Sequence, residues 1–188
     1  EFKDLPLIEI QKLLDSEIHE HRLAGLIIMT LQYPKANGLT RQAIYDLYLK
    51  NVYKGRINNW DLVDLSADKI MGTHLYDRSR DILFRLAKSD KLWERRVSIL
   101  TTFGFIKQGD PSTTIDIAEV LIHDPEDLIQ KAVGWMLREV GKRCDEQILT
   151  SFLDRHAHDM PRTALRYSIE RLNPETRRNY MSLKVTDK

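Results

Sequence analysis

Five segments of the sequence share one pattern, a polar or basic start followed by small and apolar residues. They cover residues 19–24, 59–63, 94–98, 129–133 and 161–165. When positions 22, 61, 96, 131 and 163 are taken as equivalent, successive steps are 39, 35, 35 and 32 residues. A period of this size is typical of stacked supersecondary units, none of which can bury its apolar face alone.

The residue pattern within and around these segments is helical. Apolar residues recur at three- and four-residue spacings in residues 18–33, 93–106 and 128–140, and no stretch shows sustained alternation of period two. Gly (8) and Pro (6) are scarce among the 188 residues. We therefore predict an all-α fold. The first helix of each unit is expected at residues 7–15, 40–50, 78–87, 112–122 and 146–156.

The repeat length favours HEAT-like helix pairs. It lies just below the usual armadillo and HEAT range and near the tetratricopeptide range, but the Trp, Leu-Gly and Tyr pattern of tetratricopeptide repeats is absent. We expect one domain over residues 1–188, with about five pairs in a curved solenoid whose second helices line a concave face. Because the sequence starts Glu1-Phe2-Lys3 without a Met, part-way into a helical region, we expect an N-terminal repeat to be absent.

Charge and cysteine content limit the class of protein. Lys and Arg number 29 and Asp and Glu number 28, a net charge of +1, which argues against binding nucleic acid by bulk positive charge alone. The longest apolar run, residues 23–29, is too short to span a membrane. A single cysteine, Cys144, and no signal peptide favour a reducing cytoplasm.

A basic column is expected along the concave face, interrupted at Asp61. Its members occupy equivalent positions of the second helices: Arg22, Arg96, Lys131 and the pair Arg162 and Arg166. Regularly spaced cations suit a polyanion, and each phosphate contact steepens the salt dependence of binding. The alternative is that these residues are ordinary side chains on solvated helix faces.

Two tryptophans stand out because each follows a polar helix start. Trp60 follows Asn58-Asn59 and lies four residues before Asp64, so the two share a helix face; Trp135 is expected near the start of another second helix. In the alternative interpretation the tryptophans only pack between repeats and the acids form a solvated stripe. The residues concerned would be Trp60, Trp93, Trp135, Asp61, Asp64 and Asp68.

Motifs for other chemistries are absent. The sequence has no HExxH, CxxC pair, P-loop, GxGxxG or GxSxG. His19 and His21 point to different sides of a helix, and His156 and His158 could meet a metal only by chance of loop geometry. We expect no metal and no cofactor.

Three strings then carry a family resemblance: Asn59-Trp60-Asp61-Leu62-Val63-Asp64, Leu92-Trp93-Glu94-Arg95-Arg96, and Gln130-Lys131-Ala132-Val133-Gly134-Trp135-Met136-Leu137-Arg138-Glu139. Together they resemble the DNA alkylation repair enzyme family, the AlkD-like DNA glycosylases, which are built of HEAT-like repeats. The likeness extends from Lys3 to about Tyr180 and includes Met160-Pro161-Arg162 and Leu165-Arg166-Tyr167. The family normally has another helical repeat before the point where this chain starts.

The resemblance implies a role for particular residues. Asp64 falls on the catalytic carboxylate, Trp60 and Trp135 on the tryptophans that flank the lesion's backbone, and Arg96 on a phosphate-binding arginine. Lys131 is expected to anchor phosphate beside Arg96. All four family positions hold the expected residue types. The family's substrates are cationic N3- and N7-alkylated purines, and the damaged base stays outside any enclosing pocket.

The function implied is that of a monofunctional DNA-alkylpurine glycosylase. It would hydrolyse the N-glycosidic bond of 3-methyladenine and 7-methylguanine in double-stranded DNA, as a cytoplasmic monomer. Asp64 would stabilise the oxocarbenium-like sugar and orient water. No lysine lies in the Trp60–Asp64 segment to form a Schiff base, so no lyase activity is expected. The alternative is a non-catalytic HEAT-like module that binds DNA or an acidic protein partner.

Overall fold

The computed structural model describes residue 2 and residues 4–183; residues 1, 3 and 184–188 of the expected domain lie outside this description. The first helices of the repeats are α1 (Leu7–Asp15), α3 (Gly38–Tyr53), α6 (Asp81–Ala87), α9 (Ser112–Leu121) and α11 (Glu146–His156). The second helices are α2 (His19–Gln32), α4 (Trp60–Ala67), α7 (Leu92–Thr101), α10 (Asp127–Arg143) and α12 (Arg162–Ser168).

Shorter elements complete the chain. They are the 3-10 turn η1 (Tyr33–Lys35), the π-helical turn η2 (Asp68–Gly72), α5 (Thr73–Leu75), α8 (Phe103–Ile106) and α13 (Pro174–Ser182). No strand occurs among the residues that the structure describes, which confirms the all-α prediction.

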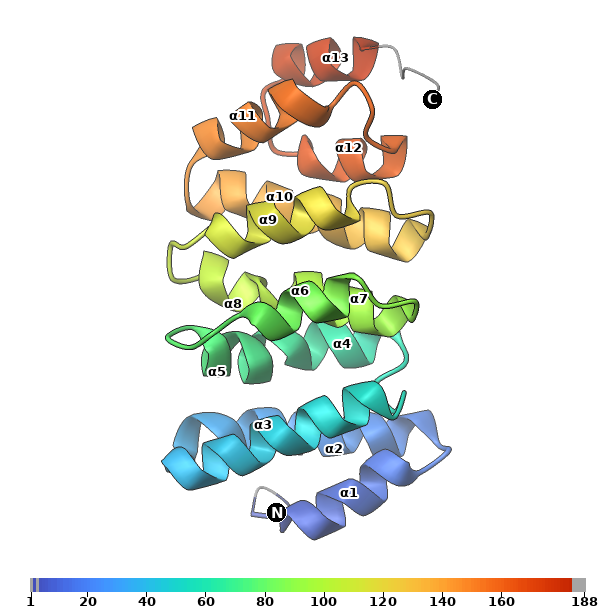
Figure 1. Ribbon diagram of the computed structural model, residues 1–188, viewed down its shortest axis with the longest axis vertical. Coiled ribbons are helices and arrows are strands. Elements are labelled where there is room, and N and C mark those ends of the chain that lie inside the picture. Colours follow the sequence, from blue (N-terminus) through green and yellow to red (C-terminus); the bar gives the residue numbers. More distant parts are fainter. Residues whose placement is uncertain (1, 3, 184–188) are drawn as a thin grey trace.

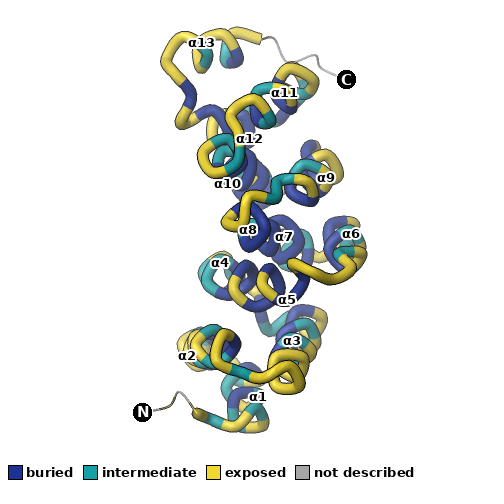
Figure 2. The backbone as a smooth tube through the Cα atoms, turned by 90° about the vertical axis from the view of Figure 1, so that its left-hand side faces the viewer, coloured by how far each residue is buried: buried dark blue, intermediate teal, exposed yellow. Residues whose placement is uncertain are grey.

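The helix pairs stack along one long axis in the order of the sequence (Figure 1). α2 packs on α4, α4 on α7, α7 on α10 and α10 on α12, so the second helices form one layer of the stack. Figure 2 shows the first helices α3, α6, α9 and α11 on the other side. The helical-repeat solenoid expected from the sequence is therefore confirmed. It brings residues from four separate repeats onto one surface.

The helix boundaries agree closely with the expected ones, because the turn chemistry is local. α1 and α11 begin and end at the expected residues. α6 begins at Asp81, three residues later than expected. In the turn before this helix, the Ser79 hydroxyl accepts a hydrogen bond from the Asp81 backbone N–H, a local contact that competes with an earlier helix start.

The buried core runs between the two layers. Its largest fully buried side chains include Tyr48, Phe105 and Phe152, from three different repeats. In the part of the chain that the structure describes, no helix is both long enough and apolar enough to cross a membrane.

Gly134 allows α12 to approach α10 closely. A Cβ atom at this position would lie 2.4 Å from the Ala164 carbonyl oxygen and 2.6 Å from the Tyr167 Cβ. Both distances are far below van der Waals contact, and the first partner is backbone, which cannot rotate away. The glycine that precedes Trp135 therefore sets how near Tyr167 lies to that tryptophan.

We expect the substitution Gly134→Ala to lower the free energy of unfolding by about 1–3 kcal/mol, because α10 and α12 must separate. Urea denaturation followed by circular dichroism measures the change. Gly38→Ala is the matched control, because nothing lies within 4 Å of a Cβ built there. Equal stability of the Gly134→Ala protein and the wild type would contradict this packing.

Candidate functional site

One hollow on the second-helix layer collects the residues singled out from the sequence. Its volume is about 280 Å³, and four helices contribute to its lining. The lining residues are Trp60 and Asp64 from α4, Arg96 from α7, Leu128, Lys131 and Trp135 from α10, and the adjoining Tyr167 of α12. All five predicted site residues therefore lie together. Leu128 and Tyr167 were not among them.

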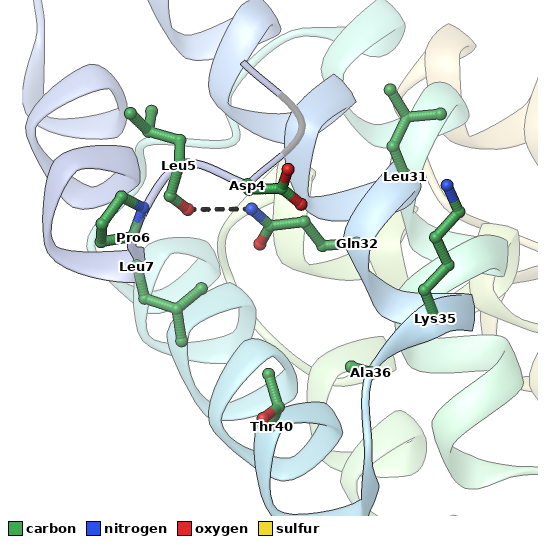
Figure 3. A pocket seen from close by; sticks show the side chains of 9 residues that line it. All are labelled: Asp4, Leu5, Pro6, Leu7, Leu31, Gln32, Lys35, Ala36 and Thr40. Carbon is green, nitrogen blue, oxygen red and sulfur yellow. Dashed lines mark hydrogen bonds between the residues drawn. The ribbon is translucent and has the colours of Figure 1, made fainter. Parts of the chain in front are cut away.

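A second hollow lies at the N-terminal end of the stack (Figure 3). It measures about 350 Å³ and is lined by residues 4–7 together with Leu31, Gln32, Lys35, Ala36 and Thr40. Gln32 Nε2 donates to the Leu5 carbonyl oxygen at 2.8 Å across it. No aromatic side chain and no carboxylate–arginine pair lines this hollow. It therefore offers less chemistry than the hollow around Asp64.

The start of α4 places Trp60 at the rim of the site. Asn59 is the N-cap residue, and its side-chain oxygen accepts a hydrogen bond from the Trp60 backbone N–H at 2.8 Å. The inner face of the helix is anchored by Leu62 and Val63, which are fully buried. Trp60 itself stays 55% exposed. A large aromatic ring this exposed on a rigid helix start is available to a ligand.

Asp64 is held by Arg96 in a two-pronged contact. Arg96 Nε donates to Asp64 Oδ1 at 2.9 Å, and Arg96 Nη2 donates to Oδ2 at 2.8 Å. Arg96 Nη1 donates to the Leu128 carbonyl oxygen at 2.5 Å. The guanidinium thus joins α4, α7 and the first turn of α10, and it fixes the plane of the carboxylate. Sequence reasoning missed this pairing, because residues 32 positions apart carry no local signal.

The Asp64 carboxylate has unused capacity. Each oxygen receives one N–H from Arg96, and an ionised carboxylate accepts about four hydrogen bonds. Its side chain is 18% exposed, against 6% for Arg96. Asp64 lines the hollow, so its remaining lone pairs are accessible from there.

Burial raises the pKa of the Asp64 carboxyl above its ordinary value. The hydrogen bonds and charge of Arg96 oppose this rise, while the neighbouring carboxylates Asp61 and Asp68 add to it. An aspartate whose pKa is raised despite an arginine partner is typical of functional sites. Burial therefore destabilises the ionised form of Asp64, and Arg96 stabilises it.

The acidic residues of α4 and of the adjoining η2 do not form a solvated stripe. His19 Nε2 lies 2.7 Å from Asp61 Oδ2, and Lys107 Nζ lies 2.5 Å from Asp68 Oδ2. Asp68 is 6% exposed. With Asp64 bound by Arg96, each acid has a basic partner on another element, so that alternative interpretation is wrong. The spacing of the acids predicts that they share a helix face, but it does not predict the basic partners that neighbouring elements contribute.

Trp135 lies in the middle of α10, not near its start. The helix begins at Asp127, eight residues before Trp135, and in the preceding turn Asp124 Oδ1 accepts a hydrogen bond from the Glu126 backbone N–H. The indole is half-buried, and its ring centroid lies 6.0 Å from that of Phe103. Trp93 is also half-buried against the core and does not line the hollow. Packing therefore accounts for Trp93 but not for the exposed Trp60.

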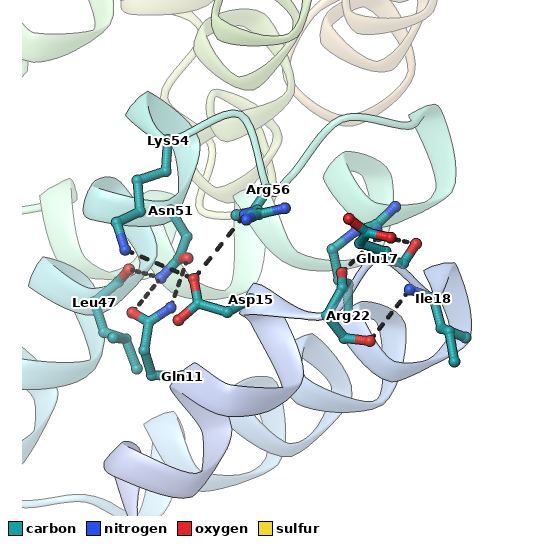
Figure 4. Close-up of polar contacts among 10 residues, drawn as sticks. Gln11, Asp15, Glu17, Ile18, Arg22, Leu47, Asn51, Lys54 and Arg56 are labelled. Atoms are coloured by element: carbon teal, nitrogen blue, oxygen red, sulfur yellow. Dashed lines mark hydrogen bonds and ion pairs between the residues drawn. The ribbon is translucent and has the colours of Figure 1, made fainter.

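The expected basic column is wrong at Arg22. This residue is 9% exposed, and its Nη1 donates to the carbonyl oxygens of Ser16 and Glu17 at 2.9 Å each. Figure 4 shows it turned toward the end of the α1–α2 connection. The alignment of the repeats predicted an exposed Arg22, because it gives the position of a residue on its helix but not the course of the neighbouring connection. Arg96, 5% exposed, is also no free surface cation.

Lys131 remains at the edge of the hollow. Its Nζ pairs with Asp127 Oδ2 at 2.6 Å, one turn earlier on α10. The hydrogen bond that Lys131 donates to Asp127 raises the pKa of the Lys131 ammonium. Among the residues that the structure describes, no three His, Cys, Asp or Glu side chains are grouped to hold a metal ion.

Comparison with known proteins identifies the family and the fold. Residues 1–172 match the family described as DNA alkylation repair enzyme. One solved structure, described as a predicted DNA alkylation repair enzyme from Enterococcus faecalis, superposes with a TM-score of 0.69 at 15% identity. The match covers 92% of this chain and 79% of that one, and at this identity it shows a shared fold. No curated protein matches the sequence significantly. Because the family match spans almost the whole chain, the protein belongs to the DNA alkylation repair enzyme family.

Proposed function

We propose that this protein is a monofunctional DNA-alkylpurine glycosylase. It hydrolyses the N-glycosidic bond of cationic purines such as 3-methyladenine and 7-methylguanine in double-stranded DNA. The observation that carries the proposal is the hollow in which Asp64 meets Arg96, Trp60 and Trp135. The proposal retains the cytoplasmic monomer expected from the sequence and needs neither metal nor cofactor.

The chemistry of the lesion explains why so few residues suffice. Alkylation at N7 of guanine or N3 of adenine places a positive charge on the base, so the base departs neutral. No general acid is then needed to protonate the leaving group. Only the deoxyribose, which becomes oxocarbenium-like as the bond breaks, requires stabilisation.

Asp64 supplies that stabilisation. Opposite unit charges about 4 Å apart at an effective dielectric of about 20 attract by roughly 4 kcal/mol, which corresponds to about a thousandfold in rate. This is the upper end, because the carboxylate also attracts the cationic ground state and Arg96 partly neutralises it. The lone pairs that Arg96 leaves free accept a proton from the attacking water.

The aromatic rings act on the same sugar. Trp60 and Trp135 offer electron-rich faces to the developing cation, in contacts worth about 0.5–2 kcal/mol each. They also shield the sugar from bulk water on their side of the hollow. In this proposal the sugar and its phosphates contact the hollow, while the purine stays outside it. Selectivity then follows from lesion charge and not from a base-shaped pocket.

Arg96 and Lys131 serve the DNA backbone in this proposal. Arg96 has five N–H donors, of which three are engaged with Asp64 and Leu128, so two remain for a phosphate. Lys131 is half-exposed, and its pair with Asp127 is a surface i,i+4 contact of small free energy. A phosphate therefore displaces Asp127 at little cost.

The same lysine bears on the question of lyase activity. The sequence placed no lysine beside Asp64, but the fold brings Lys131 into the hollow. A Schiff base requires the neutral amine, and the contact with Asp127 raises the pKa of the Lys131 ammonium. A phosphate that replaces Asp127 is also an anion and likewise favours the charged ammonium, so we assign Lys131 as a phosphate contact and not as a nucleophile, in keeping with a monofunctional enzyme.

We expect Asp64→Asn to slow the release of 7-methylguanine from duplex DNA by about a hundredfold to a thousandfold, because the charge that stabilises the sugar is lost. Single-turnover release of the free base measures the rate. Asp124→Asn is the matched control: Asp124 is also bound by an arginine of α7, with Arg95 Nε to Asp124 Oδ2 at 2.6 Å, but lies outside the hollow. Equal release by wild type and Asp64→Asn would remove Asp64 from the mechanism.

The pH dependence of base release gives a further prediction. Asp64 acts when ionised, so release falls as the pH drops through its pKa, which lies above the ordinary aspartate value. Arg96 lowers that pKa, so Arg96→Lys, which keeps the charge but loses the two-pronged contact, shifts the acid limb to higher pH. Single-turnover rates between about pH 4 and about pH 8 show the shift. An acid limb that stays in place or moves lower would contradict the assigned role of the pair.

A further inference from the structure

Three hollows with shared lining residues follow one another from the site to the C-terminal helices. The hollow that holds Asp64 ends at Tyr167, and Tyr167 also lines a second hollow with Arg166 and Glu170. Arg166 in turn lines a third, of about 450 Å³, with Ile169 of the α12–α13 connection and four α13 residues: Pro174, Arg177, Arg178 and Met181. Shared lining residues thus connect the site to α13. In Figure 2, α12 and α13 continue the column of α10.

The cations along this path differ sharply in their partners. Near Asp64 they are already paired: Lys131 with Asp127, and Arg138 with Glu139 and Glu170. Among the described residues, no carboxylate pairs with Arg166, Arg177 or Arg178, and all three are exposed. Glu170, the carboxylate that lines the second hollow, is occupied by Arg138. The free positive charge therefore begins where the site ends.

The charge of the whole chain is polarised in the same sense. Residues 161–183 contain five Arg and two Glu, a charge of +3, although the entire chain has only +1. The first 160 residues, with 22 Lys and Arg against 25 Asp and Glu, carry −3. The exposed, unpaired arginines of the C-terminal end therefore attract a duplex more strongly than the paired charges of the hollow do.

α13 is held firmly enough to present its arginines. Tyr180 donates from its hydroxyl to Asp154 Oδ1 at 2.6 Å, which ties α13 to α11. Arg162 Nη2 donates to the Leu183 carbonyl oxygen at 2.6 Å, which ties the end of α13 to α12. The third hollow also has an apolar side, formed by Ile169, Pro174 and Met181, which suits the carbon atoms of a deoxyribose.

We propose that Arg166, Arg177 and Arg178 form an anchoring groove that binds the phosphates of the duplex on one side of the lesion. The groove holds the DNA while Asp64 acts on the sugar, so it contributes to affinity and not to the chemical step. This proposal rests on the proposed function for its ligand, duplex DNA. Because phosphate contacts carry no sequence information, undamaged and damaged duplexes are bound there alike.

The test compares the wild-type chain with the double variant Arg177→Ala/Arg178→Ala. The control is Arg85→Ala/Lys88→Ala, which removes the same charge from exposed residues at the end of α6, in the other layer. Anisotropy of a labelled undamaged duplex gives Kd from about 50 to about 300 mM KCl. Single-turnover release of 7-methylguanine at saturating protein is measured in parallel.

For Arg177→Ala/Arg178→Ala we expect Kd to rise by about tenfold to a hundredfold at 0.1 M salt. The negative slope of log K against log salt should become less steep by about two. The control should change the slope by much less, and base release at saturation should stay within about twofold of wild type. A Kd and slope equal to those of the control would overturn the groove, even if the wild type releases base. If the binding changes occur as expected but the wild type releases no base, the anchoring groove is supported and the proposed glycosylase activity is refuted.

Discussion

The ion pair between Asp64 and Arg96 is the contact on which the site depends. It joins α4 to α7 directly, and the third donor of Arg96 reaches the first turn of α10. Three consecutive repeats are thus fastened at the residue proposed for catalysis. A buried carboxylate without this partner would take up a proton at neutral pH more readily, since burial raises its pKa. The same guanidinium therefore fixes the position of the carboxylate and keeps it charged.

Much of the fold follows from local sequence signals. The three- and four-residue spacing of apolar side chains, together with caps such as Asn59 and Asp145, determines where α4 and α11 begin. The repeat register then predicts which second helices are neighbours. This is why Trp60, Asp64, Arg96, Lys131 and Trp135, scattered over 76 residues, could be expected on one surface.

Side-chain partners could not be predicted in this way. Arg22 and Arg96 occupy equivalent register positions, yet one binds loop carbonyls and the other a carboxylate of the neighbouring helix. Lys131, at the same register, turns to Asp127 on its own helix. Which partner an arginine finds depends on the loops and on the closeness of helix packing, as at Gly134, where a backbone contact sets the approach of α12. The repeat supplies the surface, but tertiary packing decides which charges remain free on it.

The distribution of charge connects the site with the lesion that it is proposed to treat. The acids Asp61, Asp64 and Asp68 are each paired with a basic side chain, whereas, among the described residues, the arginines Arg166, Arg177 and Arg178 of α12 and α13 pair with no carboxylate. A carboxylate at the site repels phosphate but suits a sugar that becomes cationic. The arginines of α12 and α13 then add to the attraction for phosphate of Arg96 and Lys131, which are already paired with carboxylates. Binding and chemistry are therefore assigned to different parts of one continuous surface.

The central claim is that the damaged base leaves because it is already cationic, so that one carboxylate is sufficient. Single-turnover release from otherwise identical duplexes carrying either 7-methylguanine or hypoxanthine, a neutral purine, tests this claim most directly. The proposed mechanism predicts release of 7-methylguanine and no release of hypoxanthine above the uncatalysed background. Release of both bases at similar rates would show that the enzyme activates the leaving group itself and would contradict this claim.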